Sequence, residues 1–342
     1  MFKSKNAYSF YLQITVLLVF TGIPPHGLYA QSCCSGGVPM AGNVGGISDV
    51  ERGNLSISLN MDANILQTLK NGTQTLNDES RRRTTYSGLL KGVFSISDYF
   101  AVEGMLSYVR QERTIRHDIS EDFTFLQGFG DALLMIHFKY LETDNIQLFL
   151  GAGPKIPLGA SDLKNSRGIT MNADMQPGSG AWDAFLHHRI SWFLPFLPSS
   201  SAHLMVTYRL TGENDQYLGS QVYEIGNEWQ ILLGYSRQIF ISKQLFDYGL
   251  NVRYRNAGRD TNNGQTIPET GGDWLFLMPT LKWYLNSRFS IGLNAEIPLH
   301  SRTIGTQISP TYRINTGIFW NIPLIRKTDQ LPAEKDGMIR LF

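Results

Sequence analysis

Residues 272–300, GDWLFLMPTLKWYLNSRFSIGLNAEIPLH, alternate apolar and polar side chains in two runs that flank a short polar turn. In the second run the apolar residues occupy every other position, as Phe289, Ile291, Leu293, Ala295, Ile297 and Leu299. The positions between them are mostly polar, among them Asn294 and Glu296. Because successive side chains of a β-strand point to opposite faces, the segment predicts a hairpin with one apolar and one polar face.

The same alternation recurs through the chain and predicts about twelve strands. We place them at residues 54–65, 86–96, 100–113, 126–140, 146–158, 182–193, 202–211, 222–240, 246–256, 272–285, 289–299 and 307–320. An even number of amphipathic strands is typical of an outer-membrane β-barrel, in which the strands run antiparallel and up-and-down. A soluble β-sandwich also alternates apolar and polar residues, but we would expect shorter strands and no regular pattern of loop lengths.

Connection lengths favour the barrel. The connections after the second, fourth, sixth, eighth and tenth strands are short, whereas most of those after the odd strands are long or polar. Outer-membrane barrels have short periplasmic turns and longer extracellular loops, so both ends of the barrel segment are expected in the periplasm. Aromatic residues near the strand ends suit the girdles at the two membrane interfaces, namely Tyr86, Tyr140, Trp182, Trp192, Trp283 and Trp320.

The N-terminus has the features of a signal peptide, which we assign to residues 1–30. Lys3 and Lys5 precede an apolar centre, ITVLLVF at 14–20, and Ala30 is a plausible cleavage position. Export of a strand-rich chain without a later apolar run of membrane-helix length predicts the outer membrane of a Gram-negative-type bacterium. The expected partners are therefore the lipid bilayer, the barrel assembly machinery and a small solute.

The segments that flank the barrel are irregular. Residues 31–53 are rich in glycine and predict a periplasmic leader or a plug of the barrel, whereas 321–342 contain prolines and several charges and predict a periplasmic tail. The leader carries adjacent cysteines, Cys33 and Cys34. Three alternatives stay open for these cysteines in an oxidising compartment. They form a vicinal disulfide, they form disulfides between chains, or they bind a soft metal as thiolates.

Composition excludes some partners. The 342 residues carry a formal charge of only +1, with no basic tract, which argues against nucleic acid. The sequence contains no Gly-x-Ser-x-Gly motif, and alternation brings no serine, histidine and acid together on one face, so no enzyme is expected. His187 and His188 should point to opposite faces of one strand and cannot share an ion. We expect no cofactor and no metal site.

The polar face is the candidate functional surface. A lysine or arginine facing lipid at the bilayer midplane costs about 2–4 kcal/mol, so the charged residues of the strands should face the lumen. Alternation places these residues inside: Asp62, Lys91, Glu103, Asp131, Lys139, Lys155, Asp183, Arg189, Arg209, Glu224, Glu228, Arg253, Arg255, Lys282, Glu296 and Arg313. Two interpretations stay open, which are a salt-bridge network that fills the barrel and a polar constriction for the head group of a solute.

Apolar residues are expected on the same inward face. They are Phe129, Phe149, Phe185, Trp274, Phe276 and Phe319, with Met135, Met205 and Met278. A water-filled porin does not need so many. Apolar patches among polar groups are typical of a binding site for an aromatic or aliphatic ligand, and Trp274 and Phe276 are the aromatic candidates for the substrate path. Packing of a plug against the wall is the alternative.

Several short motifs carry a resemblance. They are GFGD at 128–131, GAGPKIPLG at 151–159, QPGSGAWD at 176–183, GNEWQILLGY at 226–235 and PTLKWY at 279–284. With them, residues 54–320 resemble the FadL-like outer-membrane transporter family associated with phenol and aromatic-compound degradation, of the MetA-pathway type. The resemblance implies a channel for small hydrophobic or aromatic molecules. A structural or general-diffusion barrel without a specific substrate is the alternative.

Overall fold

The computed structural model describes residues 52–324, which form strands, connecting loops and a short 3-10 helix at Ala173–Met175. The predicted signal peptide, Cys33, Cys34 and nearly all of the predicted leader and tail lie outside the described residues. The wall of the barrel consists of β1 (Asn54–Asn71), β3 (Arg81–Ser95), β4 (Phe100–His117), β5 (Ser120–Glu142), β6 (Ile146–Ile156), β7 (Asp183–Phe193), β8 (Ser200–Leu210), β11 (Glu228–Ile241), β12 (Gln244–Ala257), β15 (Gly272–Tyr284), β16 (Phe289–Thr303) and β17 (Thr306–Pro323). Within residues 52–324 no helix is long and apolar enough to cross a membrane.

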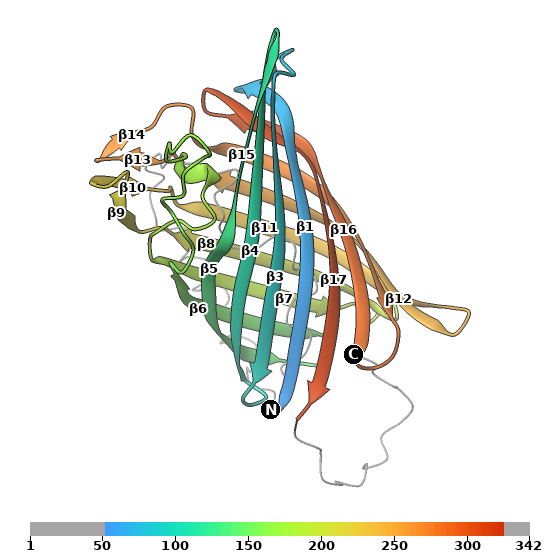
Figure 1. Cartoon of the computed structure of the whole chain (residues 1–342). Coiled ribbons are helices and arrows are strands. Elements are labelled where there is room, and N and C mark those ends of the chain that lie inside the picture. Colours follow the sequence, from blue (N-terminus) through green and yellow to red (C-terminus); the bar gives the residue numbers. More distant parts are fainter. Residues whose placement is uncertain (1–51, 325–342) are drawn as a thin grey trace, which may run out of the picture.

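These strands close into one antiparallel barrel (Figure 1). Each strand pairs with its neighbour in the chain order just given, and β17 returns to pair with β1 from Asn54↔Pro323 to Asn71↔Thr306. The two-residue strand β2 (Gln74–Thr75) only extends the end of β1. Closure leaves no open edge in the wall, and every wall strand has hydrogen-bonded neighbours on both sides, as a sheet in lipid requires. The predicted fold class is confirmed.

Burial in the wall is inverted relative to a water-soluble sheet. On β1, Asn60 is 2% exposed, whereas the next residue, Met61, is 60% exposed. The same contrast runs round the barrel, with leucine, isoleucine and aromatic side chains exposed and charged side chains buried. An outer face of apolar residues matches lipid, and the polar groups then surround a common interior. All six aromatic residues expected in the girdles are exposed.

The two rims of the barrel differ. At one rim, which we call the short-turn rim, five tight connections join β3 to β4, β5 to β6, β7 to β8, β11 to β12 and β15 to β16. At the opposite, long-loop rim the connections include residues 157–182, 211–227 and 258–271. Two long-loop connections are short, at 118–119 and 304–305.

A second sheet stands at the long-loop rim and corrects one predicted strand. β9 (Glu213–Tyr217), β10 (Gln221–Glu224), β13 (Thr261–Asn262) and β14 (Gln265–Thr266) form a four-stranded sheet outside the wall. Residues 222–240 are therefore not one strand, since the first part belongs to this sheet and the wall resumes at Glu228. The predicted inward position of Glu224 was wrong, because Glu224 pairs with Thr261 and Glu213 in the small sheet.

A bulge in β5 corrects a second prediction. The register between β4 and β5 shifts between Leu106 and Tyr108, opposite Phe129–Ala132. The shift changes which alternate positions face inward, so that Leu126 is buried and Phe129 is 59% exposed, against the edge of Tyr108. The predicted inward position of Phe129 was therefore wrong. A single extra residue in one strand moves every side chain on one side of it to the other face.

Candidate functional site

Ten charged side chains line the middle and the long-loop half of the inner wall, and we call them the charged belt. They are Asp62 on β1, Asp131 on β5, Lys155 on β6, Asp183 on β7, Arg209 on β8, Glu228 on β11, Arg253 and Arg255 on β12, Glu296 on β16 and Arg313 on β17. All are buried except Arg313, which is half-buried. Five carboxylates face five cations, so the formal charges of the belt cancel.

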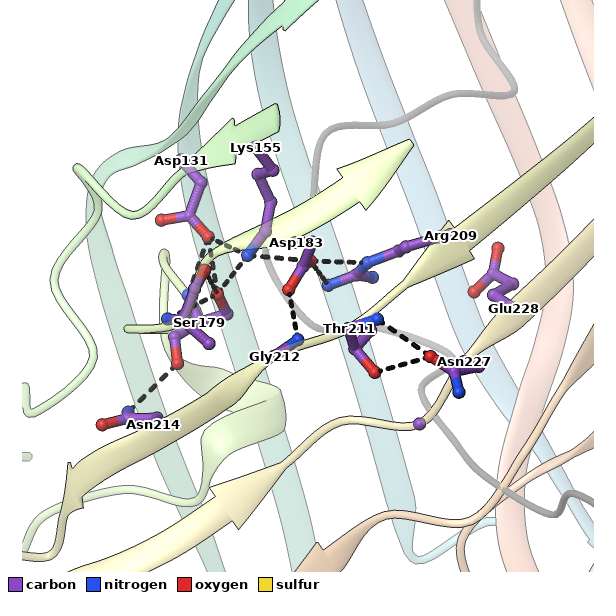
Figure 2. Close-up of polar contacts among 12 residues, drawn as sticks. Asp131, Lys155, Ser179, Asp183, Arg209, Thr211, Gly212, Asn214, Asn227 and Glu228 are labelled. Atoms are coloured by element: carbon purple, nitrogen blue, oxygen red, sulfur yellow. Dashed lines mark hydrogen bonds and ion pairs between the residues drawn. The ribbon is translucent and has the colours of Figure 1, made fainter. Parts of the chain in front are cut away.

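Four members of the belt form a continuous chain of ion pairs (Figure 2). The Lys155 ammonium lies 2.8 Å from a carboxylate oxygen of Asp131 and 3.0 Å from one of Asp183. The same Asp183 oxygen accepts from the Arg209 guanidinium at 2.7 Å. Lys155 is completely buried, so removing its charge from water is tolerable only because two carboxylates surround it.

The remaining six members continue the belt round the opposite wall. Arg255 pairs with Glu228 at 2.7 Å, and Arg253 pairs with Glu296 at 2.5 Å. Arg313 reaches Glu296 at 3.8 Å and also forms an ion pair with Asp62. The belt therefore spans the inner wall from β5 through the closing seam to β1.

Two aromatic rings lie behind the arginines of the belt. The Arg255 guanidinium is 5.0 Å from the ring centre of Trp274, and that of Arg253 is 4.5 Å from the ring centre of Phe276. Trp274 is fully buried and donates its indole N–H to the Ser309 hydroxyl at 3.0 Å. The planar face of each guanidinium thus packs against an aromatic ring, while the N–H groups at the edge of the guanidinium bind a carboxylate.

Residues 157–182, between β6 and β7, fold inward over the belt, and we call this segment the loop cap. Asp131 holds it, because its carboxylate accepts from the Gly159 N–H at 3.1 Å, the Ser179 N–H at 3.0 Å and the Ser179 hydroxyl at 2.8 Å (Figure 2). Ser179 is also hydrogen-bonded to Lys155. One buried carboxylate thus pairs with Lys155 of the belt and anchors the cap.

Further contacts fasten the loop cap to other elements. The Gln111 amide of β4 donates to the carbonyl of Gln176 at 3.3 Å, and the Asn214 amide of the small sheet donates to the Ser179 carbonyl at 3.0 Å. Arg83 of β3 forms an ion pair with Asp174. Met171 and Met175 of the cap are buried with Leu126 of β5. The cap is therefore tied to the inner faces of three wall strands.

The short-turn half of the inner wall has a different chemistry. The Lys91 ammonium lies 3.7 Å from a carboxylate oxygen of Glu103, and the same oxygen is 3.4 Å from the Nε2 atom of His137. His137 contacts His187 at 3.3 Å between ring nitrogens, over Gly151, where an added Cβ would overlap both rings. Lys139, at the rim, pairs with Glu142 at 2.7 Å.

Two more predicted cations of this half face aromatic rings. Arg189 lies 5.9 Å from the ring centre of Phe149, and the Lys282 ammonium lies 4.8 Å from that of Phe319. His188 points outward and is hydrogen-bonded to Tyr140, so the prediction that the two adjacent histidines face opposite sides is confirmed. In the described part of the chain, no group of three or more His, Cys, Asp and Glu side chains is arranged to hold a metal ion.

Every predicted charged lumen residue in the wall strands thus belongs to the belt or to the short-turn half. Among the predicted apolar residues, Met135 and Phe185 are buried in one cluster, and Met278 is buried with Trp274 and Phe276, against which Met205 packs. Gln111, Gln176 and Ser179 were not predicted as parts of the site. The signal was present in QPGSG at 176–180, whose glycines and proline mark a tight loop. The hydrogen bond from Ser179 of this motif to Asp131 joins residues 48 positions apart, and no local sequence pattern predicts such a contact.

No protein-family model matches the chain, and no curated protein matches its sequence. Among solved structures, an outer membrane channel from Pseudomonas putida F1 is similar over 80% of this chain and 98% of its own, with 14% identity and a TM-score of 0.62. The beta domain of the Bordetella autotransporter Brka follows, at 79% and 100% coverage, 9% identity and a TM-score of 0.45. A FadL homologue of Pseudomonas aeruginosa is similar over 78% and 90%, with 10% identity and a TM-score of 0.41. The first likeness supports the outer-membrane barrel fold.

Proposed function

We propose that this protein is an outer-membrane channel that passes small hydrophobic or aromatic molecules through its lumen without covalent chemistry. The observation that carries the proposal is the inner wall, where buried cations alternate with aromatic rings inside a barrel whose outer face is apolar. Such a surface binds both the ring and the polar group of a small solute. The FadL-like resemblance of the sequence points to the same class of solute.

The proposal includes an orientation in the membrane. The short-turn rim faces the periplasm and the long-loop rim faces outward, so the loop cap covers the external entrance. The predicted signal peptide exports the chain, and the glycine-rich leader with Cys33 and Cys34 keeps its predicted role as a periplasmic leader or a plug. The barrel is inserted by the assembly machinery of the outer membrane.

Solute uptake into liposomes tests the proposal. Phenylalanine is a suitable probe because its zwitterionic head group keeps it from crossing lipid alone, and serine is the matched non-aromatic solute. We expect liposomes with the full-length protein to take up phenylalanine faster than serine, although serine is smaller. Protein-free liposomes are the control. Exclusion of both solutes would remove the channel, and faster entry of serine would remove the aromatic preference.

A general structural barrel is the second candidate, because the belt is neutral, paired and buried. In that case the belt only fills the lumen and stabilises the wall. Replacing Arg253 and Arg255 with alanine separates the two functions. A change in phenylalanine uptake at unchanged barrel content supports the channel, whereas lower stability with unchanged uptake supports the structural role.

A further inference from the structure

A row of inward-facing residues crosses four strands near the short-turn rim. Lys282 of β15 is opposite Gly292 of β16, Gly292 is opposite Gly317 of β17, and Gly317 is opposite Asn60 of β1. Two adjacent glycines leave this part of the inner wall without side chains. The backbone of the wall is therefore bare between a lysine and an asparagine, and we call this place the recess.

The ring of Phe319 occupies the floor of this recess. A Cβ on Gly292 would come within 2.9 Å of the ring, and one on Gly317 within 3.2 Å. The ring thus lies against the glycine backbone, and any larger residue at Gly292 would displace it. Phe319 is half-buried, so part of its ring remains exposed.

The Lys282 ammonium stands over this floor. It lies 4.8 Å from the ring centre of Phe319 and 5.0 Å from that of Tyr284. Among the described residues, Lys282 forms no ion pair within 4.0 Å, although Asp247 is its partner across the strands. Asp247 attracts this ammonium, and the weaker charge effect comes from Lys91, which repels it. The Lys282 ammonium therefore has a carboxylate nearby but no carboxylate oxygen within ion-pair distance.

Asn60 supplies the third group of the recess. It is 2% exposed, its amide nitrogen donates to the Ser58 hydroxyl at 3.1 Å, and its side-chain oxygen accepts no hydrogen bond in the described structure. That oxygen lies over Gly317, where an added Cβ would overlap it. A buried acceptor without a donor has a free-energy cost that a hydroxyl group of a ligand would remove.

From these contacts we propose that Lys282, Phe319 and Asn60 form a binding subsite for a small aromatic carboxylate. The carboxylate binds the Lys282 ammonium, the ring of the solute stacks on Phe319 and Tyr284, and a hydroxyl on that ring donates to the Asn60 oxygen. The inference rests on the proposed channel function and names its substrate class. Hydroxylated benzoates match all three groups, whereas aliphatic acids match only the lysine.

Binding to the detergent-solubilised full-length protein, measured by calorimetry, tests the subsite. The probes are benzoate, 4-hydroxybenzoate, cyclohexanecarboxylate and benzyl alcohol. We expect both aromatic acids to bind more tightly than the other two probes, and Lys282→Met to weaken benzoate binding about tenfold or more, the effect of one charged hydrogen bond. Lys243→Met, which removes an exposed lysine from a turn at the same rim, should leave binding unchanged.

Asn60→Leu gives a second, independent comparison. Wild-type protein should prefer 4-hydroxybenzoate to benzoate, and the variant should bind both equally. Absence of benzoate binding, or equal affinity in wild type and Lys282→Met, would overturn the subsite. If phenylalanine enters liposomes while benzoate does not bind, only the subsite fails. If benzoate binds while liposomes exclude every solute, the channel function fails and the subsite stands.

Discussion

The two halves of the inner wall use the same residue types in different proportions. In the charged belt five cations meet five carboxylates, and the loop cap is fastened above them. In the short-turn half, Lys91, Lys139, Arg189 and Lys282 meet Glu103, Asp247 and the rim residue Glu142, and the Lys91 pair is 3.7 Å apart. The belt is formally neutral, whereas the short-turn half has four cations and three carboxylates.

The sharpest way to break the closed half is Asp131→Asn. The variant removes one of two carboxylates from a fully buried lysine and weakens the acceptor of three cap contacts. Breaking a buried ion pair by removing one partner costs about 3–5 kcal/mol. We expect a lower unfolding temperature and protease cleavage within residues 157–182, measured by differential scanning calorimetry and limited proteolysis.

The matched control is Asp122→Asn. Asp122 pairs with Arg167 of the same loop at 2.6 Å, but that arginine side chain is 62% exposed. Water and salt weaken such a pair, so the control should unfold and be cleaved like wild type. Equal effects of the two substitutions would show that burial of the belt contributes nothing to the closure.

Removing charge from the belt should alter ion selectivity. The double replacement of Arg253 and Arg255 by alanine leaves Glu228 and Glu296 without their closest cations and gives the belt a formal charge of −2. We expect the reversal potential in a salt gradient to shift toward cation selectivity. Replacing the exposed Arg302 with alanine is the control, and an equal shift there would assign the effect to the surface.

The small sheet at the long-loop rim should respond to pH. Burial raises the pKa of Asp260 to about 7, although the Tyr223 hydroxyl and the Gly226 N–H both donate to its carboxylate. The folded sheet therefore holds a proton that the unfolded chain releases near pH 4, so the stabilisation is greatest at low pH and is lost as pH rises through about 7.

Hydrogen exchange of the amides in β10 and β13 measures this effect when each observed rate is corrected for the intrinsic exchange rate at that pH. Protection should be greater at pH 5 than at pH 8, and Asp260→Asn should remove the difference. Wall amides of β12 serve as the internal reference. The same pH response in the variant would assign it to another group.

The smallest effect is expected at the two glycines of the recess, Gly292 and Gly317. Gly317→Ala places a Cβ against the Asn60 oxygen and the Phe319 ring, an overpacking that costs about 1–3 kcal/mol. Gly88→Ala, in a strand position with no heavy atom within 4 Å of the new Cβ, is the control. Equal unfolding temperatures for both variants would mean that the recess adapts without cost.

The wall could be predicted from sequence because alternation is local, and a side chain's face follows from its position in the strand. Prediction failed where the position of a side chain depends on a residue that is far away in the sequence. The bulge opposite Leu106 turned Phe129 outward, and the small sheet took Glu224 out of the wall. Inward charges were foreseen, but which cation meets which carboxylate depends on the stagger between strands that closure imposes.

The central claim is that the belt and the loop cap close one end of a channel. It is tested most directly by the conductance of wild type and Asp131→Asn, compared in planar bilayers. We predict a small conductance for wild type and one several-fold larger for the variant. A variant whose cap is cut by protease but whose conductance equals that of wild type would contradict the claim.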